Sequence, residues 1–462
     1  MAFKPQFEDQ IQSFGQIGEG KTYFTICFGC QMNEHDMEVT AGILESIGYS
    51  AVASLSEADL IIINTCAVRR KPEEKVTGLL GKLKVLKEKK KDLIIAVGGC
   101  MTQQDEAAAY IKKRFHHVNL IYGTHALPRF PELLRQAARQ RGTIVDIAEH
   151  TDSREGLPIR RSGNFKAWLP VIYGCNNFCS YCIVPHVRGR ERSRSMSDIL
   201  SEARSLAEQG YLELTLLGQN VNSYGLDSAA GYDFPDLLAE LDRVEGLARI
   251  RFMTSHPKDL SPRLIETVRS GKRICEHFHL PVQSGSNRIL ERMNRRYTRE
   301  SYLELAASIK AAIPGVALTT DIIVGFPGET EADFDETLFL VEETRFDNAF
   351  TFLYSPRRGT AAAALEDTLP RPEKEKRLRR LAAIQNKISL ELNQALVGET
   401  VEVLVEGASK SNPALLTGRT RTNKLVHFTA PNQPAGSLLD VTLTQARTWN
   451  MHGQIDSGEV RR

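Results

Sequence analysis

The 462-residue chain lacks any run of about 18 apolar residues, so we expect no transmembrane helix and no membrane partner. The N-terminus, Met1-Ala2-Phe3-Lys4, lacks the apolar core of a signal peptide. The eight cysteines lack the even, clustered spacing of a secreted disulfide framework. A charge excess of one sign is also missing, because 59 Lys and Arg stand against 57 Asp and Glu. These absences predict a cytoplasmic protein, which we expect to be a monomer, and overall charge does not indicate a nucleic-acid partner.

Three cysteines, Cys175, Cys179 and Cys182, follow a Cys-x3-Cys-x2-Cys spacing with no fourth cysteine nearby. Thiolates are the preferred ligands of iron–sulfur clusters. Three thiolates on a four-iron cube leave one iron without a protein ligand, and that iron can bind a substrate or a second cofactor. The alternative is three buried structural thiols, since free cysteine packs as a small hydrophobic residue. The spacing favours the cluster.

The N-terminal 140 residues alternate apolar runs with helical patterns, which is typical of a doubly wound α/β domain. Cys30, Cys66 and Cys100 each stand just past the end of an expected strand. Ligands bind at the carboxyl ends of strands in open parallel sheets, so three distant cysteines can meet there and hold a second cluster. The expected strands are residues 21–28, 59–63 and 92–97, with a helix over 36–47.

Cys27 supports two competing interpretations. With Cys30 it forms Cys-x2-Cys, which is the pattern of a redox pair. With Cys30, Cys66 and Cys100 it would complete a four-thiolate zinc site. Because Cys27 falls inside an apolar strand, we expect it to pack in the core instead. Cys275 has no partner in any pattern and is expected to be structural.

A six-fold strand–helix series begins at Trp168. Parallel repeats of this count predict a partial (β/α)6 barrel rather than a closed eight-fold one, with functional residues at the strand C-termini. The expected strands are residues 169–173, 212–217, 250–254, 277–281, 317–324 and 349–354.

The tail after about residue 391 consists of short β runs, which predict a small all-β barrel of the oligonucleotide-binding (OB-like) type. Its charge is balanced, so it would bind nucleic acid through a local patch such as Arg419, Arg421 and Lys424. The chain is thus expected to divide into an N-terminal domain (20–140), a linker (141–160), a central domain (161–390) and the C-terminal barrel (391–457).

Over nearly its whole length the chain resembles the radical S-adenosylmethionine (SAM) methylthiotransferases. These enzymes have an N-terminal methylthiotransferase domain, a radical SAM domain and a C-terminal TRAM domain. The motifs that carry the resemblance include the cysteine loop, Gly29-Cys-Gln-Met-Asn33, Arg188-Gly-Arg-Glu-Arg-Ser-Arg194, Leu280-Pro-Val-Gln-Ser-Gly285 and Val324-Gly-Phe-Pro-Gly-Glu329.

The resemblance implies two [4Fe-4S] clusters, a SAM-cleaving one on the cysteine loop and an auxiliary one on Cys30, Cys66 and Cys100. It implies insertion of sulfur and a methyl group at C2 of N(6)-dimethylallyladenosine, next to the anticodon of tRNA. A base in that loop can be splayed into a pocket. SAM, an electron donor and a sulfur source would be further partners.

The Gln31-Met32-Asn33 run favours the dimethylallyl substrate within this family. The alternative is a methylthiotransferase for threonylcarbamoyl-adenosine in tRNA or for ribosomal protein S12, and a third hypothesis is a non-catalytic metal-containing RNA-binding protein. Four residues on the predicted rim are candidates for SAM contacts, namely Gln219, Ser255, Gln283 and Asp321. Arg188 and Arg190, which follow the cysteine loop, are candidates for tRNA phosphate contacts.

Overall fold

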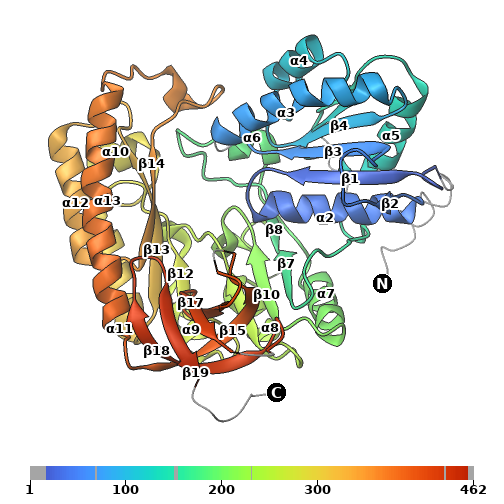
Figure 1. The fold of residues 1–462 in the computed structure, drawn as a ribbon. Coiled ribbons are helices and arrows are strands. Elements are labelled where there is room, and N and C mark those ends of the chain that lie inside the picture. Colours follow the sequence, from blue (N-terminus) through green and yellow to red (C-terminus); the bar gives the residue numbers. More distant parts are fainter. Residues whose placement is uncertain are drawn as a thin grey trace.

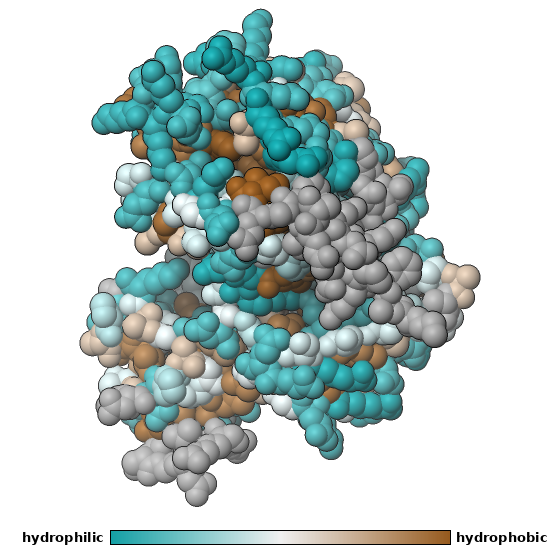
Figure 2. All heavy atoms as spheres, turned by 90° about the vertical axis from the view of Figure 1, so that its right-hand side faces the viewer, coloured by the Kyte–Doolittle hydropathy of each residue, from teal (hydrophilic) through white to brown (hydrophobic). Residues whose placement is uncertain are grey.

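The structure is a computed structural model that describes residues 17–67, 70–149, 154–229, 231–410, 412–430 and 433–455. Three units are visible in Figure 1: an α/β unit in blue, a curved sheet backed by helices in green to orange, and a small barrel in red. Figure 2 shows hydrophilic side chains over most of one face, with apolar residues in small patches. None of the helices in the described ranges is long and apolar enough to cross a membrane.

The N-terminal unit is a parallel sheet in the order β2-β1-β3-β4-β5-β6. Its strands β3 and β4 are buried along their whole length, which their continuous apolar runs predict. Helices α2 and α5 pack on one face, and α3 and α4 on the other. The bounds are β1 Thr22–Cys27, α2 Gln31–Ser46, β2 Ser50–Ala51, β3 Leu60–Thr65, α3 Arg70–Lys89, β4 Ile94–Gly99, α4 Asp105–Arg114, β5 Leu120–Tyr122, α5 Phe130–Arg139 and β6 Ile144–Asp146.

The doubly wound prediction is confirmed, with two differences. Helix α2 begins at Gln31, directly after Cys30, whereas the sequence predicted a start at residue 36. The apolar pattern misses the first turn because that turn is mostly polar. Strand β6 lies within the expected linker, so the sheet continues past residue 140. Three residues are too few to show a strand periodicity. Residues 150–153 of that linker lie outside the described residues.

The central unit consists of two three-stranded parallel sheets, β7-β10-β11 and β12-β13-β14, joined by a bridge between Ile250 and Ile274. In chain order the six strands form the predicted partial barrel, with helices on its outer face. The bounds are β7 Lys166–Pro170, β8 Ile172–Tyr173, α6 Val184–Arg188, β9 Arg192–Ser193, α7 Met196–Glu208, β10 Glu213–Leu217, α8 Phe234–Leu241, β11 Arg249–Phe252, α9 Pro262–Ser270, β12 His277–His279, α10 Asn287–Arg292, α11 Arg299–Ala312, β13 Ala317–Val324, α12 Glu331–Thr344 and β14 Asn348–Leu353.

Helix α13 (Arg371–Gln394) leads from the partial barrel into the C-terminal unit, a closed barrel in the order β15-β16-β17-β19-β18. Alternate residues of its strands form a separate apolar core, as an OB-like barrel requires. Its strands are β15 Thr400–Ala408, β16 Leu416–Thr420, β17 Leu425–Thr429, β18 Leu438–Ala446 and β19 Met451–Ile455.

Candidate active site

Cys30, Cys66 and Cys100 lie just past the carboxyl ends of β1, β3 and β4, which are neighbours in the sheet. Cys66 and Cys100 are buried and Cys30 is half-buried. Burial is the main cause that raises the pKa of the Cys100 thiol to about 12; the charge of Arg188 opposes this rise, and the charges of Cys30 and Cys66 contribute to it. The topology therefore brings the three cysteines together, and their thiolates need a positive partner to remain ionised.

Asn33 ties these three cysteine-bearing loops together. Its Oδ1 faces Sγ of Cys30 at 3.8 Å and Sγ of Cys100 at 3.7 Å. Its Nδ2 donates to the carbonyl oxygens of Phe28 at 3.1 Å and Thr65 at 2.9 Å. The last residue of the Gln31-Met32-Asn33 run thus organises the cysteine set.

Arg188 is a further part of this site. Its Nε donates to Cys100 Sγ at 3.2 Å, and its Nη2 donates to Asn33 Oδ1 and Asp36 Oδ2, both at 2.9 Å. The residue is 7% exposed. Its guanidinium is therefore enclosed by partners within the protein, and a contact between Arg188 and a tRNA phosphate stays a prediction without support from this geometry. Arg190 is exposed, with its guanidinium 4.7 Å from the ring centre of Phe178, and its contact with tRNA stays a prediction.

The second cysteine set lies in the loop between β8 and α6. Cys175 and Cys179 are buried and Cys182 is half-buried. Burial raises the pKa of Cys175 to about 11 and that of Cys182 to about 12, with the Cys179 charge adding to both. The loop begins at Gly174 with a φ of 73°, where a Cβ would overlap the carbonyl oxygen of Arg190, so only glycine fits.

The segment after α10 supports this loop. The amide of Ser180 donates to the carbonyl oxygen of Met293 at 3.0 Å, and Asn294 Nδ2 donates to that of Phe178 at 3.0 Å. Arg295, which is 4% exposed, donates from Nη1 to Cys179 Sγ at 3.3 Å. Its Nη2 donates to the carbonyl oxygen of Pro281 at 2.7 Å. Sequence reasoning missed Arg295, because no spacing links it to the cysteines more than a hundred residues earlier in the chain.

Within the described ranges, no group of three or more His, Cys, Asp and Glu side chains is placed to hold a single metal ion. A zinc site gathers its thiolates around one ion, whereas a four-iron cube accepts each thiolate on a different iron. The prediction that Cys27 packs in the core is wrong, because its side chain is exposed at the end of β1. Cys275 is buried, which is compatible with the structural role expected for it.

Three of the four candidates for SAM contacts, Gln219, Ser255 and Gln283, follow strands β10, β11 and β12, whereas Asp321 lies within β13. Ser255 is fully buried, and its Oγ has no hydrogen-bond partner among the described residues. The backbone of Gln283, at a φ of 71°, pairs with β13 by donating to the carbonyl oxygen of Asp321 at 2.8 Å. Gln219 is half-buried after β10. An unpaired buried hydroxyl fits a polar ligand at this position, and the four contacts stay predictions.

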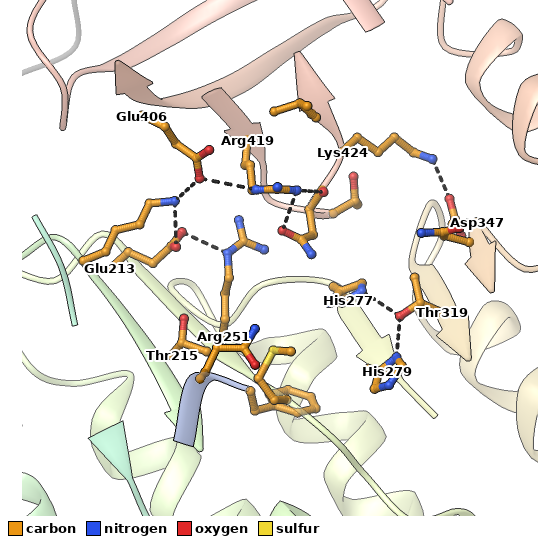
Figure 3. A pocket seen from close by; sticks show the side chains of 18 of the residues that line it. Glu213, Thr215, Arg251, His277, His279, Thr319, Asp347, Glu406, Arg419 and Lys424 are labelled. Atoms are coloured by element: carbon orange, nitrogen blue, oxygen red, sulfur yellow. Dashed lines mark hydrogen bonds and ion pairs between the residues drawn. The ribbon is translucent and has the colours of Figure 1, made fainter. Parts of the chain in front are cut away.

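A cavity of about 960 Å³ opens between the inner face of the partial barrel, the start of α2 and the C-terminal barrel. In Figure 3, Glu213 and Arg251 line one side, with Nε of Arg251 donating to Glu213 at 2.9 Å. His277 and His279 lie opposite, both hydrogen-bonded to the Thr319 hydroxyl. Gln31, the residue after Cys30, also lines the cavity, together with Glu34 and Glu38 of α2.

The basic residues of the C-terminal barrel hold that barrel in place. Arg421 Nη2 bonds Glu276 at 2.6 Å, and Lys424 Nζ bonds Asp347 at 2.6 Å. Arg419 forms an ion pair with Glu406 at 3.3 Å. In the opposite direction, Arg251 of β11 donates to two backbone carbonyls of the barrel at 2.7 Å. The suggestion that Arg419, Arg421 and Lys424 form an RNA-binding patch is therefore wrong, because they are engaged in contacts within the protein.

Three segments of the chain match known protein families. Residues 169–341 match the radical SAM superfamily, residues 22–123 match the uncharacterized protein family UPF0004, and residues 394–455 match the TRAM domain. The structure of the radical SAM methyltransferase TsrM from Kitasatospora setae, solved with tryptophan and a SAM analogue, is similar with a TM-score of 0.53 at 14% identity. The similarity covers 84% of this chain and 79% of that one. The fold is therefore that of a radical SAM enzyme.

Two curated relatives match this chain over nearly its whole length. A protein of Acetivibrio thermocellus is 53% identical over 98% of this chain and 96% of its own length. One of Moorella thermoacetica is 53% identical over 95% of this chain and 99% of its own. Both are named tRNA-2-methylthio-N(6)-dimethylallyladenosine synthase. The chain belongs to this family of radical SAM enzymes that act on tRNA and use SAM and two [4Fe-4S] clusters.

Proposed function

We propose that this chain places sulfur and a methyl group on C2 of N(6)-dimethylallyladenosine in tRNA, with its two clusters held by the two cysteine sets described above. Cys175, Cys179 and Cys182 would hold the SAM-binding cluster, and Cys30, Cys66 and Cys100 the auxiliary one. The observation that carries the proposal is the pair of separate cysteine sets, each with one sulfur accepting a hydrogen bond from a buried arginine. Two sets of three thiolates suit two clusters that each keep one iron free of protein ligands.

The cofactors supply the hard chemistry, namely reductive cleavage of SAM for hydrogen abstraction and a source of sulfur. The chain's own residues position and insulate them. Arg295 donates to Cys179 from a buried position, and Arg188 does the same for Cys100. Hydrogen bonds to cluster sulfurs and burial set the reduction potential, so these arginines adjust each site separately.

The cavity next to Gln31 is large enough for a nucleoside and its prenyl group, since small-molecule sites span about 300–1,000 Å³. An unpaired loop base can leave its stack and enter such a pocket. The reaction consumes an electron, a sulfur atom and, as the methyl donor, a second SAM molecule, so it requires an electron donor and a sulfur source as partners. We place the enzyme in the cytoplasm, where tRNA is modified and thiols stay reduced, and propose that it acts as a monomer.

The test is the iron and sulfide content of anaerobically reconstituted protein, for the wild type and a Cys175/Cys179/Cys182 triple alanine variant. About eight iron atoms per chain are expected in the wild type and about four in the variant, as two independent four-iron clusters require. About four in the wild type and none in the variant would leave the N-terminal cysteines without a cluster. Substrate choice is tested with tRNA lacking the dimethylallyl group, on which full turnover would refute the proposed substrate.

A further inference from the structure

We propose that the turn between β18 and β19 of the C-terminal barrel, residues 447–450, is an RNA contact. In this proposal Trp449 stacks on an unpaired base of the tRNA anticodon loop, and Arg447 binds a backbone phosphate. The inference rests on the proposed function, because it takes tRNA as the substrate. It locates on this barrel a contact that Arg419, Arg421 and Lys424 do not supply.

Trp449 is 71% exposed, more than any other large hydrophobic side chain in the described part of the chain. A single exposed apolar side chain is common on protein surfaces, so exposure alone does not indicate a ligand. Trp449 also lines the cavity that reaches Gln31. The indole thus faces the cavity that we propose for the target base. Phe350, which is 49% exposed on the edge strand β14, lines this cavity as well.

The turn is held in shape by the partial barrel. Nδ2 of Asn393 in α13 donates to the carbonyl oxygens of Arg447 at 2.8 Å and Thr448 at 3.2 Å. Across the turn, the amide of Arg447 donates to the carbonyl oxygen of Asn450 at 2.9 Å. Lys424 Nζ in turn donates to Asn393 Oδ1 at 2.9 Å. A turn fixed in this way loses little conformational entropy on binding, which favours affinity.

Two polar features next to Trp449 also suit RNA. Arg447 is exposed, and no ion pair found among the described residues includes it. Burial lowers the pKa of both His427 and His452, and the positive charge of Arg447 lowers it as well. These two histidines are therefore neutral, and Arg447 is the cation of this turn. Asn450 Oδ1 is buried without a hydrogen-bond partner among the described residues, and Asn450 lines the cavity.

An exposed aromatic ring beside a free cation is the arrangement by which proteins hold unpaired nucleotides. The ring stacks on the face of a base, and the cation takes the phosphate. Stacking tolerates any base, so the turn would supply affinity rather than sequence selection. The dimethylallyl group and the target base would be read elsewhere in the cavity.

The test is the dissociation constant of a fluorescently labelled anticodon stem-loop containing N(6)-dimethylallyladenosine, measured by anisotropy on full-length, anaerobically reconstituted enzyme. Trp449→Ala is expected to raise Kd roughly 10-fold or more, which is the size of one lost base stack. Trp449→Phe should retain most of the affinity, because a phenyl ring also stacks. Arg447→Gln should lower the slope of log K against log salt by about one, as the loss of one phosphate contact requires.

Phe339→Ala is the matched control. Phe339 is 48% exposed on α12 and does not line the cavity, so its removal should leave Kd unchanged. Iron content and melting temperature equal to those of the wild type show that each variant is folded. Wild-type affinity in Trp449→Ala would overturn this inference and leave the proposed function intact. An equal loss in Trp449→Phe and Trp449→Ala would also overturn it, because it would show that stacking is not the interaction. A wild-type enzyme that neither binds nor modifies the stem-loop would refute the proposed function itself.

Discussion

The two cysteine sets differ in how the chain assembles them. Cys175, Cys179 and Cys182 share one loop, whereas Cys30, Cys66 and Cys100 come from three strand ends in different parts of the N-terminal unit. The first set is local and its spacing is readable in the sequence. The second exists only because a parallel sheet aligns its strand ends at one edge. A set of three cysteines can therefore be assembled either by close spacing along the chain or by the alignment of strand ends in a sheet.

The two sets also share a physical connection, helix α6. The helix begins directly after the cysteine loop, yet its Arg188 donates to Cys100 of the other set. An apolar cluster that contains Ile183, Val187, Ala67 and Cys100 packs the helix against the N-terminal unit. A rigid, short element therefore fixes the distance between the two sites.

The largest expected effect separates the roles of the two sets. Cys182→Ala should abolish SAM cleavage and product together, because the cofactor that cleaves SAM loses a ligand. Cys66→Ala should abolish the methylthio product but leave SAM cleavage largely intact. Measuring 5′-deoxyadenosine and modified tRNA in the same reactions distinguishes the two. If Cys66→Ala lost both activities, the N-terminal cysteines would merely hold the fold.

A smaller effect is expected on the reduction potentials of the two clusters, because each has its own buried arginine. Arg188→Met should lower the reduction potential of the auxiliary cluster alone, and Arg295→Met that of the SAM-binding cluster alone. Each variant removes a positive charge and a donor that stabilise the reduced cluster. The shift should be roughly 60 mV or more, the one-electron equivalent of a charged hydrogen bond. The measurement is a redox titration followed by electron paramagnetic resonance. Equal shifts in both clusters for either variant would contradict the separate assignment.

The smallest expected effect is a loss of stability in acid, to which one buried histidine of the N-terminal unit and one of the partial barrel contribute. Burial lowers the pKa of His35 in α2 to about 3, and burial does the same for His277 in β12. Unfolded histidine takes up a proton below about pH 6.5, whereas these folded sites stay neutral down to about pH 3. The free energy of unfolding should therefore fall as pH drops below 6.5, by up to about 1.4 kcal/mol per pH unit for each histidine.

Urea unfolding at pH 7 and pH 5.5 measures this loss. His35→Leu and His277→Asn should each reduce the difference between the two pH values by roughly 1 kcal/mol, because each removes one site of proton uptake from the unfolded chain. An unchanged difference in both variants would show that other groups control the acid sensitivity.

Much of the fold was predictable because its patterns are local. The strands of the partial barrel were found within a few residues, since continuous apolar runs bounded by polar loops are visible along the chain. Strands β2, β5 and β6 were missed because they have only two or three residues each. Exposure was less predictable than secondary structure. Cys27 lies in an apolar strand yet is exposed, since it is the last residue of β1.

The sequence by itself determined the class of protein, through its motifs, and the cysteine loop, because the spacing of Cys175, Cys179 and Cys182 is local. It also predicted that Cys30, Cys66 and Cys100 meet, but the parallel sheet brings them together. Only the tertiary structure decided what the arginines do. Arg188 stands in a basic run that suits phosphate, but folding buries it against Cys100 and Asp36. Arg295 bonds to a cysteine 116 positions away along the chain. A charged side chain takes the partner that packing brings within hydrogen-bond distance, and that distance is set by the fold rather than by the order of residues.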